Sequence, residues 1–293
     1  MNTVQSQLSG SLITRDIAPL GDDDLRRRLE IGAVATLVDR PFECAGLNPC
    51  RLAESSDGRA KSISYDPRTR ALKGAGDDGP SRALLATLLE NYAGWALQFV
   101  RKALPSYAPA LTFGRTSFRH RPADHAMSPR KDDRRLHVDA FPSQPVQGRR
   151  ILRVFHNCNP AGEARVWHVG ECFADHVARF LPRIASGHRA ALPAWFLQAA
   201  GLTKGRRTSY DALMLALHDA AKADDAYQAE APRQKLTFAP GATWLAFTDA
   251  VPHAAISGRF ALEQTFLMPV EAMALPDAAP VRVLELMIGR RLT

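Results

Sequence analysis

Hydrophobic residues recur at helical spacing in the N-terminal third of the chain. Over residues 83–100 the apolar positions lie three or four residues apart, at Leu85, Leu88, Tyr92, Trp95 and Phe99. This spacing places them on one face of an amphipathic helix, with Ser81 as its expected N-cap. We interpret the aromatic stripe as core packing and not as a cofactor site. A second helix is predicted over residues 22–37, since three acidic residues at its start suit a helix N-terminus.

From about residue 110 onward, hydrophobic and polar positions alternate, which is typical of β-strands. The alternation predicts strands over residues 111–119, 150–156, 165–169, 242–248 and 260–267. A block of helical pattern separates the third of these strands from the fourth and contains the apolar stretch 195–197. Strands on both sides of an inserted helical block favour an antiparallel sandwich or barrel decorated with helices.

The composition is that of a protein with a substantial core. The chain has 293 residues, of which 46% are hydrophobic and 23% are charged. Disorder, a collagen-like repeat and a coiled coil are therefore excluded for most of it. Lys and Arg number 38 against 30 Asp and Glu, which gives a net charge of +8. This charge favours acidic partners: nucleic acid, an anionic membrane surface, or a small substrate with carboxylates or phosphates.

Cysteine usage and hydropathy both favour a soluble protein of the cytosol. The four cysteines are scattered along the chain: Cys44, Cys50, Cys158 and Cys172. They do not make a disulfide framework, so we expect reduced thiols. No basic segment followed by an apolar run is visible at the N-terminus, so no signal peptide is predicted. The apolar stretch 83–100 contains Glu90, Asn91 and Gln98 and is too polar to span a bilayer.

The tripeptide His137-Val-Asp139 is the most informative sequence in the chain. In a strand, residues two apart project from the same face, with Cα atoms about 7 Å apart. His137 and Asp139 can therefore direct an imidazole and a carboxylate at one metal ion. The candidate third ligand is His253, which follows a later predicted strand. Two histidines and one carboxylate form a facial triad that leaves three positions on Fe(II) open, as an oxygenase requires.

Arg259 opens the predicted strand that follows His253. A guanidinium there can hold a carboxylate through two parallel hydrogen bonds. His-x-Asp, a distant His and an Arg on the next strand are the pattern of Fe(II)/2-oxoglutarate oxygenases. Taken one by one, His253 and Arg259 are better explained as ordinary loop and turn residues; together they favour a site. A zinc hydrolase with the same ligands is an alternative, although no His-Glu-x-x-His helix supports it.

Several longer sequence segments resemble the Kdo 3-hydroxylase family. They are residues 136–143 (LHVDAFPS), 148–155 (GRRILRVF) with Asn157, Asn159 and Pro160, 205–211 (GRRTSYD), 217–219 (LHD) with Lys222, Tyr227 and Gln228, and Pro252 and His253 with Ser257, Gly258 and Arg259. The resemblance covers nearly the whole chain beyond about residue 20. Members of that family are Fe(II)/2-oxoglutarate dioxygenases that act on lipopolysaccharide precursors. They add a hydroxyl at carbon 3 of 3-deoxy-D-manno-oct-2-ulosonic acid (Kdo), which gives the sugar Ko.

The resemblance implies an α+β fold with a double-stranded β-helix core, also called a jelly-roll or cupin-like core. We expect a flexible tail over residues 1–20 and a single oxygenase domain over residues 21–293. Within that domain, residues 21–109 would form an N-terminal helical part and residues 271–293 a C-terminal segment. The jelly-roll core would comprise residues 110–170 and 235–270, with a helical insertion over residues 171–234.

Carried over to this sequence, the resemblance makes His137, Asp139 and His253 the catalytic iron ligands and Arg259 the partner of the 2-oxoglutarate carboxylate. Arg259 lies only six positions after His253, closer than is usual in the wider superfamily. Four other residues can therefore share or take over that contact: Arg149, Arg153, Asn157 and Ser117. Basic and aromatic residues would contact an acidic substrate, namely Arg115, Arg119, Arg206, Arg207 and Tyr210. The expected cofactors are Fe(II), 2-oxoglutarate as co-substrate and O2, with ascorbate as a candidate reductant.

The resemblance also implies a Kdo-lipid A glycolipid as substrate and no nucleic-acid partner. A basic cytoplasmic enzyme would then make peripheral contact with the anionic cytoplasmic face of the inner membrane, where each nearby Lys or Arg adds about 1 kcal/mol. We expect the apolar stretch 195–197 to be buried and not to touch lipid. Two alternatives remain: the same chemistry on another acidic small molecule, and a non-enzymatic basic nucleic-acid-binding protein. Only the net charge favours the latter.

Overall fold

The computed structural model describes residues 21–37, 42–44, 48–122, 128–186 and 205–293. Two features expected from the sequence, the flexible tail over residues 1–20 and the apolar stretch 195–197, lie outside the described residues.

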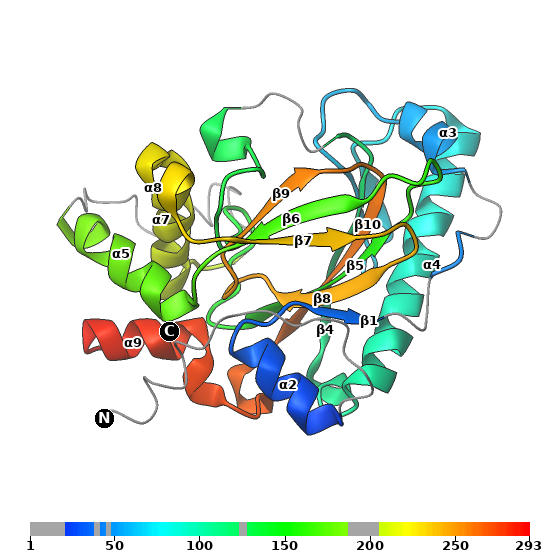
Figure 1. Ribbon diagram of the computed structural model, residues 1–293. Helices are drawn as coiled ribbons and strands as arrows, with labels where there is room; N and C mark the ends of the chain where they lie inside the picture. The colour runs from blue at the N-terminus through cyan, green and yellow to red at the C-terminus, as the bar shows by residue number, and fades with distance from the viewer. Residues whose placement is uncertain (1–20, 38–41, 45–47, 123–127, 187–204) are drawn as a thin grey trace.

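The core is a sandwich of two antiparallel sheets (Figure 1). The larger sheet has seven strands, in the order β1 (Ala35–Leu37), β8 (Thr243–Phe247), β5 (Arg150–Asn157), β10 (Ala261–Met268), β4 (Thr112–Arg119), β2 (Ile63–Asp66) and β3 (Ala71–Lys73). The smaller sheet has three strands, in the order β7 (Gln234–Phe238), β6 (Arg165–Val169) and β9 (His253–Ser257). This arrangement confirms the α+β fold with a jelly-roll core.

Aromatic side chains fill the space between the two sheets. The Trp244 ring on β8 stacks on Phe238 of β7 with ring centroids 4.0 Å apart. It also stacks on Phe155 of β5, with ring centroids 5.2 Å apart. Trp167 of β6 meets Phe155 edge-on at 4.8 Å. Large rings that face inward from both sheets hold the sheets together by burying apolar area. The Trp167 ring also stacks on His253 at 5.0 Å, so this core borders the site described below.

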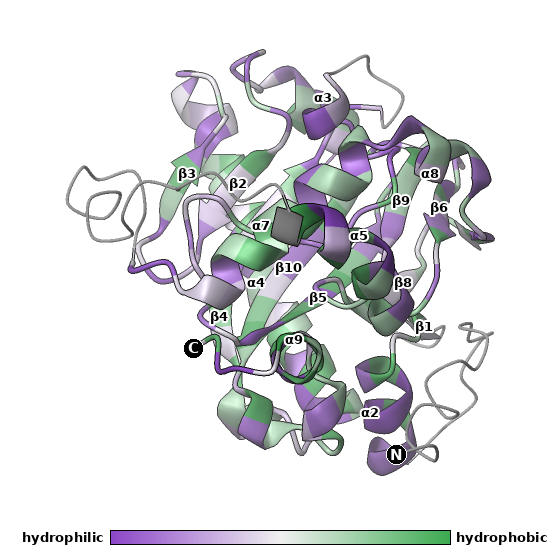
Figure 2. Ribbon diagram, turned by 90° about the vertical axis from the view of Figure 1, so that its left-hand side faces the viewer, coloured by the Kyte–Doolittle hydropathy of each residue, from purple (hydrophilic) through white to green (hydrophobic). Residues whose placement is uncertain are grey.

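Helices cover the outside of the sandwich. The described helices are α2 (Asp22–Glu30), α3 (Pro49–Glu54), α4 (Gly79–Ala103), α5 (Phe173–Ser186), α7 (Ser209–Ala223), α8 (Asp225–Glu230) and α9 (Pro280–Ile288). The long helix α4 packs on the large sheet, and the hydroxyl of its Tyr92 donates a hydrogen bond to the Val154 carbonyl of β5 at 3.0 Å. Figure 2 shows α5, α7 and α9 together on another side of the molecule.

Two helix boundaries differ from those expected. Helix α2 ends at Glu30 and not at residue 37, because Gly32 has a φ of 105° and residues 35–37 continue as strand β1. Helix α4 begins two residues before Ser81, and the carboxylate of Asp78 accepts a hydrogen bond from the Ser81 N–H as the actual N-cap. The N-terminal part of the chain thus supplies strands β1, β2 and β3 to the large sheet as well as helices.

Candidate active site

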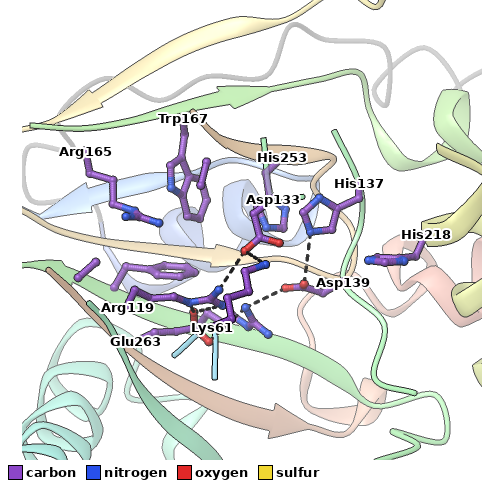
Figure 3. Close-up of a pocket in the computed structure, with 14 residues that line it drawn as sticks. Lys61, Arg119, Asp133, His137, Asp139, Arg165, Trp167, His218, His253 and Glu263 are labelled. Atoms are coloured by element: carbon purple, nitrogen blue, oxygen red, sulfur yellow. Dashed lines mark hydrogen bonds and ion pairs between the residues drawn. The ribbon is translucent and has the colours of Figure 1, made fainter. Parts of the chain in front are cut away.

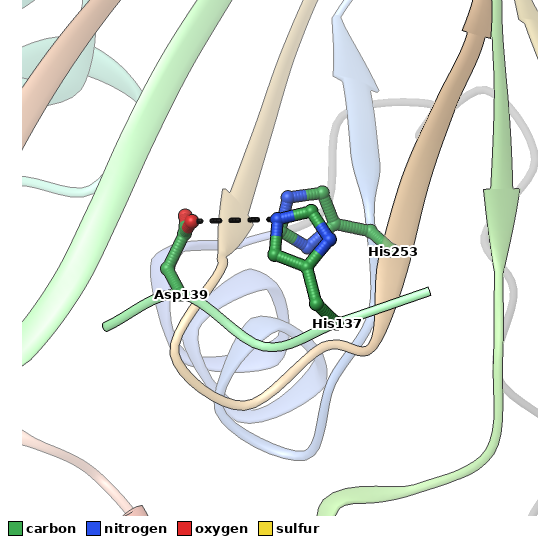
Figure 4. Close-up of side chains that lie close together, drawn as sticks. All are labelled: His137, Asp139 and His253. Carbon is green, nitrogen blue, oxygen red and sulfur yellow. Dashed lines mark ion pairs between the residues drawn. The ribbon is translucent and has the colours of Figure 1, made fainter. Parts of the chain in front are cut away.

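Backbone pairing brings His137, Asp139 and His253 to one place (Figure 4). The segment that carries His137 is not a regular strand, but it forms a single antiparallel bridge with the first residue of β9. Two residues later, the Asp139 N–H donates to the Thr248 carbonyl at 2.8 Å. The possible ligand atoms of the three side chains lie within 4.8 Å of one another, and His137 Nε2 is 3.9 Å from an Asp139 oxygen.

Each imidazole is held with its Nε2 available for a metal. The Nδ1 atom of His137 is 2.7 Å from the Arg135 carbonyl oxygen, and Nδ1 of His253 is 2.8 Å from the Val251 carbonyl oxygen. Because a carbonyl only accepts, Nδ1 of each ring carries the proton and Nε2 keeps its lone pair. Burial lowers the pKa of both histidines, and that of His137 lies well below its usual range, so the neutral form that binds metals is favoured.

The third ligand, Asp139, is ionised and largely but not fully buried, with 12% of its side chain exposed. Burial alone would raise the pKa of its carboxyl, but the neighbouring groups, first among them the Arg153 guanidinium, outweigh burial and lower it. Arg153 Nη1 lies 3.2 Å from Asp139 Oδ2, yet this oxygen makes no hydrogen bond within the described protein. A buried carboxylate oxygen without a hydrogen bond is costly. A divalent metal ion bound by Asp139 and the two Nε2 atoms accounts for it, so the residues fit Fe(II).

A cavity of about 140 Å³ adjoins the three ligands (Figure 3). One part of its wall is apolar and consists of Phe155, Trp167, Ala255 and Ala261. The other part is highly charged, with four cationic side chains and three carboxylates: Lys61, Arg119, Arg153, Arg165, Asp133, Asp139 and Glu263.

Most of these charges are paired with one another. Glu263 is buried on β10 and lies 2.7 Å from Arg119 and 3.2 Å from Arg153. Burial would raise the pKa of Glu263, but the two guanidinium groups outweigh burial and lower it. Arg119 also contacts Asp133 at 3.0 Å, and Lys61 and Lys222 lie against the same Asp133 carboxylate. The pairs form one continuous network along the wall of the cavity.

Arg165 on β6 is the exception in this network. Its guanidinium is buried and donates one hydrogen bond to the Gly258 carbonyl at 2.9 Å, and no carboxylate of the described residues forms an ion pair with it. Burial and the neighbouring Arg119 lower its pKa to about 10. A buried cation with no anionic partner is unfavourable in an empty pocket and favours binding of an anionic group there.

His218 of helix α7 also lines the cavity. Its ring lies edge-on to that of His137 with centroids 5.1 Å apart, and Figure 3 shows it pointing toward the metal ligands. Its Nδ1 is 2.9 Å from the Asp219 carboxylate, which in turn lies 2.7 Å from Arg130. The neighbouring residues therefore hold the orientation of His218 at the edge of the metal centre.

Comparison with known proteins decides the family. Residues 14–291 match the family described as 3-deoxy-D-manno-oct-2-ulosonic acid (Kdo) hydroxylase. The chain belongs to the Kdo hydroxylase family. This result confirms the resemblance drawn from the sequence segments, and with it that the chain is an enzyme. None of the curated proteins compared with the chain matches it.

Crystal structures of a relative, the Kdo hydroxylase KdoO, a non-heme Fe(II) α-ketoglutarate-dependent dioxygenase, have the same fold. The complex of KdoO with α-ketoglutarate and Fe(III) is 38% identical and has a TM-score of 0.86, over 97% of this chain and 98% of that chain. The complex with succinate and Fe(III) is 38% identical with a TM-score of 0.87, over 96% and 97% of the two chains. The complex with cobalt(II) is 39% identical with a TM-score of 0.85, over the same shares.

Of the co-substrate residues expected in this Kdo hydroxylase, Arg153 lines the cavity and four do not. The Arg259 guanidinium lies over the Phe260 ring at 4.2 Å, and the Asn157 side chain donates to two backbone carbonyls. Arg149 donates to the Val146 carbonyl instead. Ser117 is buried on β4. The contacts of Arg259, Asn157 and Arg149 hold these three side chains at other places in the fold.

Of the expected substrate residues, Arg119 lines the cavity, and the others lie elsewhere. Arg115 donates to the Ser64 hydroxyl, and Arg207 donates to the Pro142 carbonyl. Tyr210 is buried in the main core, and Arg206 lies at an exposed position just before α7.

Sequence reasoning assigned no role at the site to five residues of the cavity that have charged or imidazole side chains: Lys61, Asp133, Arg165, Glu263 and His218. One signal for Arg165 was present, because it stands two residues before Trp167 on a strand with strict alternation, and the two must share a face. For Lys61 the sequence carries no such signal.

Proposed function

We propose that this member of the Kdo hydroxylase family is an Fe(II)/2-oxoglutarate-dependent dioxygenase that hydroxylates carbon 3 of Kdo in lipid A-linked inner core. The product is Ko, with release of succinate and CO2. The observation that carries this proposal is the convergence of two neutral imidazoles and one ionised carboxylate beside a cavity with an unneutralised arginine. The relative KdoO is a Kdo hydroxylase that depends on Fe(II) and α-ketoglutarate, which supports the proposal.

His137, Asp139 and His253 would hold the ferrous ion through Nε2, a carboxylate oxygen and Nε2. When bound, Fe(II) and 2-oxoglutarate would supply the electrons that activate O2 for oxidation of the substrate. The chain contributes a fixed set of three ligands, all from one side of the centre. Arg153 beside Asp139 keeps this carboxylate ionised, and His218 stands at the edge of the centre.

Arg165 is the residue we propose for the distal carboxylate of 2-oxoglutarate. Its planar guanidinium presents paired N–H donors that match a carboxylate. The apolar wall next to it, formed by Phe155, Trp167 and Ala255, suits the two methylene groups of the co-substrate and excludes water. Arg259 was the residue expected from the sequence, but its guanidinium rests on Phe260 and is not among the described residues that line the cavity.

A lipid-linked substrate would bring the enzyme to a membrane surface. We propose peripheral contact with the anionic cytoplasmic face of the inner membrane, supported by the net charge of +8. No described helix has both the length and the hydrophobicity needed to cross a membrane.

Two measurements, made one after the other, test the proposal. Anaerobic titration of the protein with Fe(II) and 2-oxoglutarate should give the weak visible charge-transfer band of such complexes, and His253→Ala should abolish it. Mass spectrometry of Kdo-bearing lipid A after aerobic turnover should then show one added oxygen, located at carbon 3 of Kdo. A band without oxygen addition to Kdo, together with oxidation of another acidic molecule, would contradict the proposed substrate.

A further inference from the structure

With iron and 2-oxoglutarate bound, the cavity would keep a net positive charge that one further carboxylate could neutralise. Four Lys and Arg side chains and three carboxylates line it. A ferrous ion adds two positive charges, and 2-oxoglutarate removes two. One positive charge therefore remains, in a cavity where low dielectric makes an unneutralised charge costly. Kdo carries one carboxylate, which would neutralise it.

Lys61 is the cation best placed for this second anion. Arg153 is buried and Arg119 is half-buried, with 22% of its side chain exposed, and both are engaged with Glu263. Arg165 is enclosed beside Trp167. The Lys61 side chain, in contrast, is 36% exposed and stands at the rim of the cavity, where an incoming sugar would arrive. Figure 3 shows its side chain reaching up toward Asp133 from the side of Arg119 and Glu263, with His137 and Asp139 farther to the right.

The contacts of Lys61 leave it able to bind a ligand. Its ammonium donates to the Lys131 carbonyl at 3.0 Å and pairs with the Asp133 carboxylate. An ammonium has three N–H donors, so one remains for a ligand oxygen. Asp133 would stay paired if Lys61 turned toward a ligand, because Arg119 at 3.0 Å and Lys222 at 3.4 Å contact it independently.

The chemistry of the reaction places the sugar carboxylate at this position. Carbon 3 of Kdo is bonded to carbon 2, which carries the carboxylate, so this group lies two bonds from the reacting carbon. A sugar oriented with carbon 3 toward the metal must therefore keep its carboxylate inside the same cavity. We infer that Lys61 binds the carboxylate of the sugar substrate and selects acidic sugars. This inference rests on the proposed function.

The test compares two forms of one substrate, Kdo-bearing lipid A and the same glycolipid with the Kdo carboxylate converted to its methyl ester. The wild type should prefer the acid in kcat/KM by about tenfold or more, as expected for one charge-assisted contact. Lys61→Met should raise KM for the acid by a similar factor and bring the acid-to-ester ratio close to one. Lys61→Arg should keep most of the preference.

Lys131→Met is the matched control, because it removes an exposed ammonium from the residue whose backbone carbonyl accepts from Lys61, and the Lys131 side chain does not line the cavity. It should keep the wild-type acid-to-ester ratio. The affinity for 2-oxoglutarate can be read anaerobically from the charge-transfer band. In Lys61→Met it should stay within about twofold of wild type, because Lys61 is expected to contact the sugar and not the co-substrate.

Three results would overturn the inference. An unchanged acid-to-ester ratio in Lys61→Met, with wild-type turnover of Kdo, contradicts the role of Lys61 alone. Equal losses of kcat/KM for acid and ester would mean that Lys61 only supports the fold around Asp133. Failure of the proposed function shows separately, as an absent charge-transfer band or no oxygen addition to Kdo by the wild type, and it overturns both proposals.

Discussion

His137 and His253 exchange two backbone hydrogen bonds, since the N–H of each donates to the carbonyl of the other, at 3.1 and 2.9 Å. Their ring centroids lie 4.9 Å apart as a direct result of this pairing. The distance between the two imidazoles is therefore set by main-chain geometry and not by flexible side chains. We expect the site to be formed before the metal arrives.

Loss of one ligand should abolish metal binding without unfolding the protein. In His253→Ala the donor set falls to one imidazole and one carboxylate, while the backbone pairing with His137 remains possible. We expect the rise in Tm produced by Co(II) in the wild type to disappear, with an unchanged circular dichroism spectrum. His168→Ala, on the neighbouring strand β6 but outside the cavity lining, should keep the Co(II)-dependent rise. A preserved rise in His253→Ala would contradict the ligand assignment.

Arg165→Met should weaken 2-oxoglutarate binding by about a hundredfold, because one end of the co-substrate loses a charge-assisted pair in a buried site. Arg165→Lys should lose less, since it keeps the charge but not the paired donors. The dissociation constant can be read anaerobically from the charge-transfer band. Arg259→Met serves as the comparison, and its constant should stay close to wild type. A larger loss of 2-oxoglutarate affinity in Arg259→Met than in Arg165→Met would instead assign the distal carboxylate to Arg259.

The buried ion pair of Arg150 and Asp249 should be a major determinant of stability. Both side chains are fully buried, with Arg150 Nε 2.8 Å from an Asp249 oxygen and the guanidinium 4.1 Å from the Phe247 ring centroid. Asp249→Asn leaves a buried cation unpaired and should lower the free energy of unfolding in urea by about 3–5 kcal/mol. Asp24→Asn, in an exposed pair with Arg28, should cost less than about 1 kcal/mol. Equal losses of unfolding free energy in Asp249→Asn and Asp24→Asn would contradict the expectation that the buried pair contributes more.

His156 should make the fold sensitive to acid. Burial lowers its pKa from an ordinary 6.5 to about 4, so the unfolded chain binds the proton more readily than the folded chain. Its contribution to stability is present above pH 6.5 and is lost as the pH falls toward 4. The loss amounts to about 3 kcal/mol. His156→Asn can keep the contact with Thr243 that Nδ1 makes at 3.0 Å. Its free energy of unfolding should fall less steeply with pH over this window, and an unchanged slope would contradict the assignment.

Much of the site could be predicted because its ligands obey local rules. His137 and Asp139 share a face since any extended segment turns alternate side chains the same way, even where only one bridge forms. The predicted strand 165–169 has the same bounds as β6 because this strand alternates between buried and half-buried residues. Strand β9 was not predicted as a strand, because the sequence HAAIS lacks such alternation.

The charged residues of the cavity could not be predicted in the same way. An arginine in a sequence is most often solvated, and only the place of Arg165 two residues before Trp167 on a strand distinguishes it locally from the exposed Arg206. Lys61 reaches the cavity only because β2 pairs with β4, far along the chain. Arg259 follows the pattern of the superfamily, but the turn at Gly258 directs its guanidinium onto Phe260. Long-range packing decides these positions.

The rim lysine comes from the loop just before β2, whereas every metal ligand comes from later parts of the chain. If Lys61 does recognise the sugar acid, then recognition and oxidation are encoded in separate stretches of the gene. Mutations in the early stretch can change which sugar is accepted while the oxidising centre stays intact. New acceptor preferences could therefore evolve, or be engineered, by changing this loop alone.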